Sequence, residues 1–176
     1  MKDKDGIIAD GAIRSGKTVS MSLSYVLWAK NKDGRWIATK EYYYSGRDED
    51  NQKTDTEYAD DLQEWLGKIK SEKIVVDPSA ASFIAELKKR GHTIKKAKND
   101  VLDGIRLVAS LLNEDKIAIH ESCTNTILEF NSYTWDAKVS EKGEDKPIKQ
   151  HDHAMDAVRY FCYTIIRKPN GISILK

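Results

Sequence analysis

The stretch Ile74-Val75-Val76-Asp77-Pro78-Ser79-Ala80 decides the fold of this chain. Three consecutive β-branched apolar residues predict a short buried strand over residues 73–77, and Pro78 ends it. Residues 80–90 then predict a helix, which Gly91 ends with a left-handed cap. A buried strand that leads directly into a helix is typical of an α/β sheet. Asp77 ends the strand where open α/β sheets position their ligands.

Similar patterns along the chain predict the remaining elements. Strands are expected at residues 6–10, 35–45, 93–97 and 116–120, and helices at residues 54–70, 101–113, 123–133 and 149–167. Residues 19–30 are ambiguous, because their alternation favours a strand whereas a glycine-bearing loop is more often followed by a helix. With the strand reading, the order predicts an α/β fold with a mixed sheet and helices on both of its faces.

The composition indicates one compact globular domain. The chain has 176 residues, of which 40% are hydrophobic and 32% charged, and no stretch is long and apolar enough to predict a membrane span. Two cysteines without metal-ligand spacing, Cys123 and Cys162, favour a reduced, cytoplasmic environment.

A net charge of +1 does not by itself indicate a nucleic-acid binder. Contacts with DNA would have to come from local basic patches, which could equally be solvated surface. The candidate patches are Lys88, Lys89 and Arg90, and Lys95, Lys96 and Lys98.

The segment His151-Asp152-His153-Ala154-Met155-Asp156 is a candidate metal-binding turn. On a helix, His153 and Asp156 share one face because they are three residues apart. Carboxylate oxygens suit Mg²⁺ or Mn²⁺, and a pair of such ions can clamp a phosphodiester for attack by water. Two alternatives stay open. Asp77 could cap the following helix, and an acid in a first turn could serve the helix dipole.

Residues 11–18, Gly-Ala-Ile-Arg-Ser-Gly-Lys-Thr, fit the phosphate-binding loop pattern in full. Gly11, Gly16, Lys17 and Thr18 would be its nucleotide-binding residues, because such loops cradle phosphates with backbone amides and a lysine. The chain has no room for the acidic strands of a working ATPase sheet, so we interpret this loop as vestigial. An ATP-binding protein that uses the loop is the alternative.

Several segments, in order, resemble the nuclease domain of phage terminase large subunits. They are EYYYSGRDEDNQKTDTEYADDL at 41–62, VVDPSAASFIAELKKRGH at 75–92, NDVLDGIR at 99–106, and residues 129–160, from EFNSYTWD to DHAMDAVRY. The resemblance covers residue 27 to the C-terminus. It implies a ribonuclease H-like fold and a two-metal endonuclease that cuts double-stranded DNA during packaging. It also implies the small terminase subunit and the portal protein as partners, in the host cell cytoplasm.

The family holds its ions with acids at the ends of the first and fourth strands and on the last helix. Asp77 matches the second acid and Asp156 the third, and His153 matches the family histidine one turn before the last acid. The first acid has no match. Residues 10–18, DGAIRSGKT, resemble instead the start of the same proteins' ATPase domain. We therefore interpret residues 1–26 as an ATPase remnant joined by an internal deletion to a nuclease domain at 27–176.

This interpretation leads to a hypothesis about the missing strand. Ile7-Ile8-Ala9-Asp10 would replace it, and Asp10 would become the third metal ligand beside Asp77 and Asp156. Residues 19–30 would form the second strand, since tertiary pairing can override local preference. In the alternative, residues 1–20 are disordered or helical and the site keeps two acids. That case fits an inactive prophage remnant that folds and binds DNA weakly.

Two further acids match the family motif, and we expect structural roles for both. Asp100 is expected to cap a helix and Asp103 to lie on a helix face. Arg106 could pair with Asp103 or contact a DNA phosphate.

Overall fold

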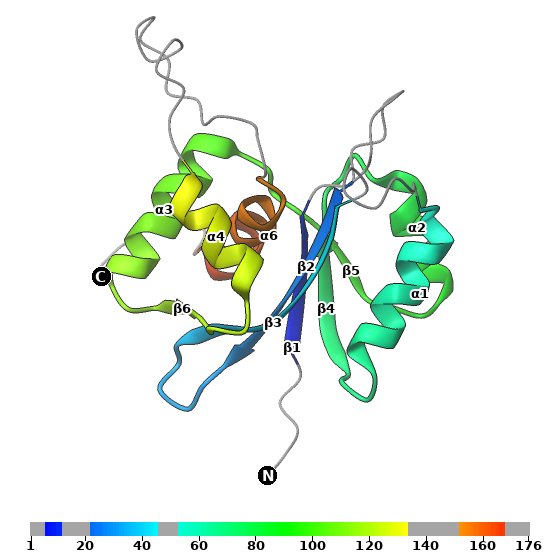
Figure 1. Cartoon of the computed structure of the whole chain (residues 1–176), viewed down its shortest axis with the longest axis horizontal. Helices are drawn as coiled ribbons and strands as arrows, with labels where there is room; N and C mark the ends of the chain where they lie inside the picture. The colour runs from blue at the N-terminus through cyan, green and yellow to red at the C-terminus, as the bar shows by residue number, and fades with distance from the viewer. Residues whose placement is uncertain (1–5, 12–21, 46–52, 134–151, 168–176) are drawn as a thin grey trace, which may run out of the picture.

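The computed structural model describes residues 6–11, 22–45, 53–133 and 152–167 (Figure 1). The strands are β1 (Gly6–Gly11), β2 (Ser22–Lys30), β3 (Trp36–Ser45), β4 (Ser71–Val76), β5 (Ile94–Lys96) and β6 (Ile117–Ile119). The helices are α1 (Asp55–Leu66), α2 (Ala81–Lys89), α3 (Val101–Asn113), α4 (Thr124–Ser132) and α6 (His153–Phe161), with the π-helical turn η1 (Cys162–Ile166). The order of elements agrees with the predicted α/β pattern.

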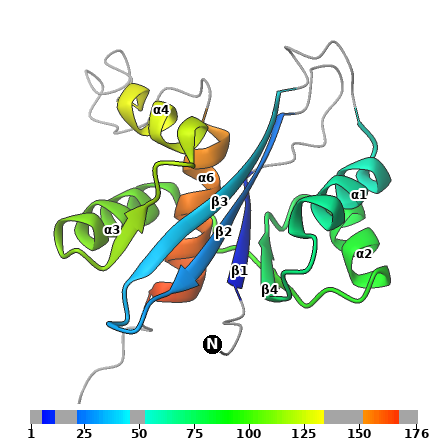
Figure 2. The same cartoon turned by 60° about the horizontal axis from the view of Figure 1, so that its bottom comes forward.

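All six of these strands form one mixed sheet in the order β5-β4-β1-β2-β3-β6. Strand β2 runs antiparallel to β1 and β3, and the other neighbouring pairs are parallel. Helices α3, α4 and α6 cover one face of the sheet, and α1 and α2 cover the other (Figures 1 and 2). The predicted mixed sheet with helices on both faces is confirmed.

Strand β1 lies in the middle of this sheet. Ala9 pairs with Val75 of the parallel strand β4, and Asp10 pairs with Tyr25 of the antiparallel strand β2. The strand predicted at residues 6–10 is therefore present, and residues 22–30 form a strand, not a helix. Backbone pairing of β2 with β1 on one side and β3 on the other decides what the local sequence left ambiguous. Residues 12–18 of the predicted phosphate-binding loop lie outside the described residues.

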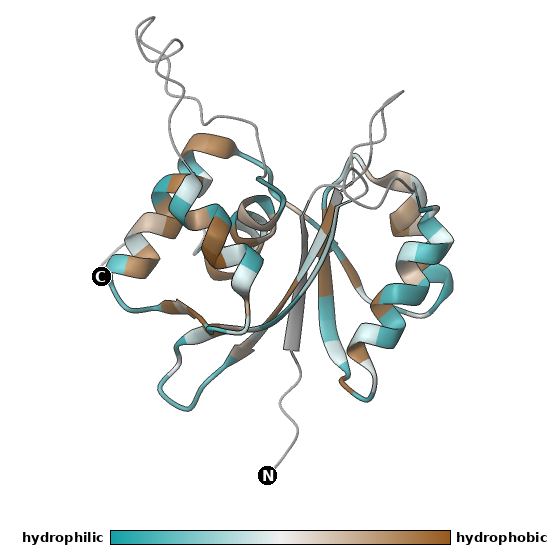
Figure 3. Ribbon diagram, in the orientation of Figure 1, coloured by the Kyte–Doolittle hydropathy of each residue, from teal (hydrophilic) through white to brown (hydrophobic). Residues whose placement is uncertain are grey.

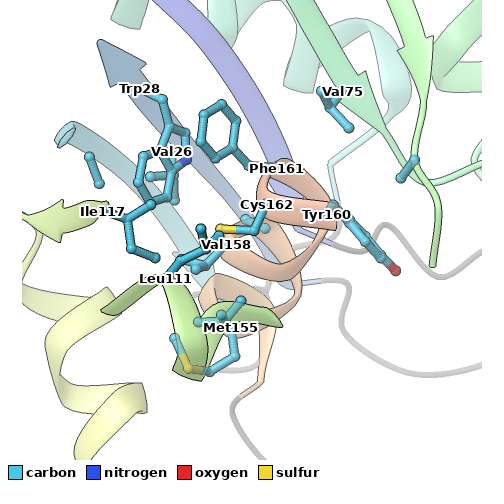
Figure 4. Packing of buried hydrophobic residues seen from close by; sticks show 14 of the residues in the cluster. Val26, Trp28, Val75, Leu111, Ile117, Met155, Val158, Tyr160, Phe161 and Cys162 are labelled. Carbon is cyan, nitrogen blue, oxygen red and sulfur yellow. The ribbon is translucent and has the colours of Figure 1, made fainter. Parts of the chain in front are cut away.

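Each face of the sheet has its own core, because successive side chains of a strand point to opposite faces. Val26 and Trp28 of β2 pack toward α6, where the Trp28 and Phe161 rings stack with centroids 4.3 Å apart (Figure 4). Tyr25 and Leu27 pack toward α1 and α2. The outward faces of α1 and α2 are largely hydrophilic (Figure 3). Both cysteines are buried and free.

Helix α1 begins and ends at signals that the sequence carries. Thr54 and Glu57 form a capping box at its start. The helix ends at Leu66, earlier than the predicted residue 70, because Gly67 adopts a φ of +56°. Gly91, with a φ of +86°, follows α2 in the left-handed conformation expected for it.

The last helix differs from the single helix predicted over residues 149–167. It begins at His153, and from Cys162 it widens into the π-helical turn η1. The Arg167 amide donates to the Cys162 carbonyl, five residues back, at 3.0 Å. Among the described helices, none combines the length and the apolar character that a bilayer crossing requires.

Replacing Phe161 by alanine should destabilise the fold by about 3–5 kcal/mol, because a fully buried ring that stacks on Trp28 is lost from the core. Urea unfolding followed by circular dichroism measures the change. Leu128→Ala is the control, since Leu128 is 64% exposed and should cost less than about 0.5 kcal/mol. Equal losses for both variants would contradict this packing.

Candidate metal centre

Asp77 follows β4 directly and is only 7% exposed. The Ser79 amide donates to its Oδ1 at 2.8 Å, and the Tyr160 hydroxyl donates to its Oδ2 at 2.5 Å. Burial alone would raise the pKa of Asp77, but the hydrogen bonds from Tyr160 and Ser79, together with the nearby Arg159 charge, outweigh it and lower the pKa. Asp77 is therefore ionised at neutral pH.

Asp77 fulfils only in part the alternative role of capping the following helix. Its carboxylate accepts the Ser79 amide as expected, but the Ala80 amide donates to the Asp77 backbone carbonyl at 3.1 Å. Helix α2 begins at Ala81, so Asp77 orders the turn before the helix. This turn leaves the second carboxylate oxygen directed at Tyr160 of α6.

Asp156 lies in the first turn of α6 and is 8% exposed. Arg159, one turn later and 5% exposed, donates from Nη2 to Asp156 Oδ1 at 2.5 Å. The Arg159 Nη1 donates to the backbone carbonyls of Asn99 and Asp100, at 2.8 and 3.1 Å. The guanidinium thus fixes Asp156 to the residues that lead into α3.

Gly104 of α3 provides the room for this arginine. A Cβ atom at Gly104 would lie 2.6 Å from Arg159 Cγ and 2.8 Å from Cδ, far inside van der Waals contact. The glycine within the NDVLDGIR segment is thereby explained by the close approach of α6 to α3.

Tyr160 brings Asp77 and Asp156 into one neighbourhood. It lies four residues after Asp156, on the same side of α6, and its hydroxyl reaches Asp77. Its phenol points out of the apolar cluster, away from Trp28 and Phe161 (Figure 4). Burial, the Asp156 charge and the hydrogen bond to Asp77 all raise the pKa of Tyr160, so both carboxylates act on one phenol. The two acids therefore lie on the same side of the molecule.

The structure describes the other predicted site residues to different extents. His153 is half-buried and begins α6, one turn before Asp156. Asp10 is the second-last residue of β1. Because β1 and β4 run parallel, its backbone lies at the same carboxyl end of the sheet as that of Asp77. The Asp10 side chain and residues Gly16, Lys17 and Thr18 lie outside what the structure describes, and Gly11 is the last residue of β1.

The described part of the chain contains no group of three or more His, Cys, Asp or Glu side chains arranged to hold a metal ion. Asp77 and Asp156 supply two hard oxygen donors, which fit Mg²⁺ or Mn²⁺ by their chemistry. Whether Asp10 joins these two acids as a third ligand stays a prediction, because its side chain is outside the described residues.

Glu129 of α4 is buried beside the start of α6, a position that its sequence pattern did not predict. Its carboxylate is 4% exposed and accepts the Ala154 and Met155 amides at 2.8 and 3.0 Å, and the Tyr43 hydroxyl at 2.9 Å. Burial raises the pKa of Glu129 to about 7, although the hydrogen bonds from Met155, Tyr43 and Ala154 oppose the shift. Periodicity does not distinguish a buried glutamate from a solvated one, and the available signal was that Glu129 opens the EFNSYTWD segment that resembles the family.

The basic patches differ in their availability. Arg90 is engaged within the protein, by ion pairs with Asp60 at 2.5 Å and Glu86 at 2.8 Å. Lys88 and Lys89 of the same patch are exposed. The exposed lysines of the second patch lie on or just after β5, the edge strand beside β4. These are Lys95, Lys96 and Lys98.

The two structural acids of α3 behave as predicted. Asp100 accepts the Asp103 amide at 3.1 Å and so caps the helix. Asp103 faces outward and forms an ion pair with Arg106 at 3.8 Å.

Gly104→Ala should destabilise the protein although alanine normally favours a helix. Overpacking against Arg159 costs about 1–3 kcal/mol, which exceeds the ~1 kcal/mol that alanine gains over glycine in a helix interior. Urea unfolding measures the net change. In an Arg159→Ala background the clash is gone, so the same substitution should become stabilising. If Gly104→Ala is as costly without the arginine, the explanation of this glycine is wrong.

Glu129→Gln should change how stability depends on pH. The folded protein keeps a proton on Glu129 until about pH 7, whereas the unfolded chain releases it near the ordinary value. The stability from this retained proton is full below the ordinary pKa and is lost as pH rises through about 7. Between pH 4.5 and 8, the free energy of unfolding of Glu129→Gln should therefore rise relative to that of the wild type by up to about 3 kcal/mol, measured by urea unfolding.

Glu57→Gln is the matched control for this pH profile. Hydrogen bonds from the Thr54 amide and hydroxyl lower the pKa of Glu57, so its contribution is present above the ordinary pKa and is lost as pH falls. The two variants should deviate from wild type with opposite slopes. A flat difference for Glu129→Gln would contradict the raised pKa.

Comparison with known proteins gives a consistent family. The family model described as "Terminase RNaseH-like domain" matches residues 21–163. The terminase large subunit of Escherichia phage T5 is 32% identical over 134 residues, which are 73% of this chain and 30% of that protein. The large terminase of a thermophilic bacteriophage, in complex with ADP, is 43% identical with a TM-score of 0.86, over 96% of this chain and 41% of that one.

A more distant structure agrees in fold alone. The large terminase nuclease domain of bacteriophage SPP1, solved with bound Mn, is 23% identical with a TM-score of 0.60, over 90% of this chain and 85% of that domain. The present chain spans less than half the length of the large terminases of phage T5 and of the thermophilic phage.

Proposed function

We propose a nuclease function for this chain, which belongs to the family of terminase ribonuclease H-like domains. In this proposal it is a metal-dependent endonuclease that hydrolyses phosphodiester bonds of double-stranded DNA. The observation that carries the proposal is the shared neighbourhood of Asp77 and Asp156, two buried acids remote in sequence that both act on Tyr160. Buried carboxylates that the fold keeps ionised are a common feature of cation sites.

Asp77 and Asp156 would hold Mg²⁺ or Mn²⁺, in our proposal two ions, with Asp10 as the third ligand and His153 in support. Manganese in the SPP1 domain of the same fold is consistent with a divalent ion. Such ions, when bound, supply positive charge that stabilises the phosphodiester transition state and activates the attacking water.

The chain's own residues prepare this site. Tyr160 and Ser79 keep Asp77 ionised, and Arg159 fixes the direction of the Asp156 carboxylate. The exposed lysines on and after β5 would contact the DNA backbone beside Asp77, since phosphate contacts position a duplex without reading its sequence. These lysines are Lys95, Lys96 and Lys98.

The wider role follows from the relatives that the chain partly covers. The large terminases of phage T5 and of the thermophilic phage are longer proteins. We propose that this chain serves DNA packaging in the host cytoplasm, with the small terminase subunit and the portal protein as partners. Residues 1–26 would be a remnant of the ATPase part, with residues 11–18 vestigial as a nucleotide loop.

The proposal is tested by cleavage of supercoiled plasmid DNA in Mg²⁺ or Mn²⁺. Wild type should nick and linearise the plasmid, and Asp77→Ala and Asp156→Ala should each lower the rate at least about 100-fold, because each removes a ligand of an ion worth several kcal/mol. Asp33→Ala is the control, since it removes an exposed carboxylate from the turn between β2 and β3. It should cut at the wild-type rate.

Two further arms separate the alternatives. Asp10→Asn should lower the rate as strongly as Asp77→Ala if Asp10 is the third ligand. Titration with ATP should show no binding to the wild type. Binding that is lost in Lys17→Ala would instead support the alternative of an ATP-binding protein. Wild type that cuts nothing in either ion would refute the nuclease and favour an inactive remnant.

A further inference from the structure

The first turn of α6 is capped from another helix. Asp152 precedes the helix but forms no side-chain hydrogen bond with the first-turn amides. The amides of Ala154 and Met155 donate instead to one oxygen of Glu129, Oε2, at 2.8 and 3.0 Å. A carboxylate of α4 thereby satisfies two of the four amides that a helix start leaves without partners.

Glu129 is itself held on both sides. Its other oxygen, Oε1, accepts the hydroxyl of Tyr43 on β3 at 2.9 Å. Helix α4 is attached to the same strand by Glu41, whose carboxylate accepts the amides of Asn125 at 2.7 Å and Thr126 at 2.9 Å. Strand β3 thus fixes α4 through Glu41, and α4 fixes the start of α6 through Glu129.

This arrangement determines where Asp156 lies. Asp156 directly follows Met155, whose amide Glu129 accepts, and its own amide donates to the Asp152 carbonyl at 2.8 Å. The rotation and height of this first turn fix the direction of the Asp156 side chain. Reacting groups that are misplaced by about 1 Å can lose 100-fold in rate, so a fixed helix start has functional value.

We propose that Glu129 is a positioning residue for Asp156, acting through the amides of Ala154 and Met155 without touching the metal. Its effect on metal binding rests on the proposed function, whereas its effect on the start of α6 does not. When ionised, Glu129 also carries the negative charge that a helix N-terminus favours, but the geometry requires only an acceptor oxygen.

That distinction between charge and acceptor makes the conservative variant informative. Glu129→Gln keeps one carbonyl oxygen, which can accept both amides as Oε2 does, whereas Glu129→Ala removes the acceptor. Mn²⁺ titration of the full chain, followed by electron paramagnetic resonance, should show about 10–100-fold weaker binding for Glu129→Ala, as for other residues that orient ligands. Glu129→Gln should bind close to the wild-type affinity.

Glu57→Ala is the matched control. Glu57 accepts the Thr54 amide at 2.7 Å at the start of α1, on the other face of the sheet from α6. Its loss should lower stability without changing Mn²⁺ affinity. Equal weakening by Glu57→Ala and Glu129→Ala would mean that general destabilisation is responsible, and the positioning role would be refuted.

Amide hydrogen exchange of the metal-free chain provides a second, independent readout. Glu129→Ala should speed exchange at Ala154 and Met155, and Glu129→Gln and Glu57→Ala should not. If wild type binds no Mn²⁺, the proposed function fails, but the exchange rates still decide whether Glu129 holds the start of α6. Unchanged exchange in Glu129→Ala overturns the inference, as does unchanged Mn²⁺ affinity in a wild type that binds the ion.

Discussion

The structure depends on two acidic side chains that are removed from water, one directly after β4 and one in the first turn of α6. An ionised carboxylate loses much of its hydration when it is buried, so it persists only where hydrogen bonds or an opposite charge replace that hydration. Asp77 has a phenol and a backbone amide for this purpose, and Asp156 has a guanidinium. Both the phenol and the guanidinium come from α6, which explains why the packing of that helix matters so much.

The charges of this neighbourhood do not balance within the described residues. Asp77 and Asp156 carry two negative charges, and Arg159 supplies one positive charge that acts on both. An excess of negative charge in a poorly hydrated environment attracts cations more strongly than the same charges would in water. The guanidinium is itself committed to the carbonyls before α3, and Gly104 keeps it there. Arg159 is therefore a fixed internal cation beside these two acids.

The sequence predicted the order of elements, the caps at the end of α2 and at the start of α3, and the acid at the end of β4, because each depends on residues close together in the chain. Residues 19–30 could not be decided locally, since their conformation comes from pairing with β1 and β3. The roles of Glu129 and Glu41 were out of reach for a similar reason. Their partners lie 25 or more positions away, and a buried glutamate contradicts the usual preference for the surface. The role of Asp10 as a ligand stays a prediction.

The central position of β1 has a consequence for the order in which the chain folds. This strand is synthesised before its neighbours, yet one of its two edges waits for residues 71–76, and the helix that covers it comes later still. At ordinary ribosomal speed this leaves an unsatisfied strand edge for roughly ten seconds. A nascent chain with such an edge is open to pairing with other chains, so a holdase chaperone that shields the first thirty residues would raise the yield of native protein.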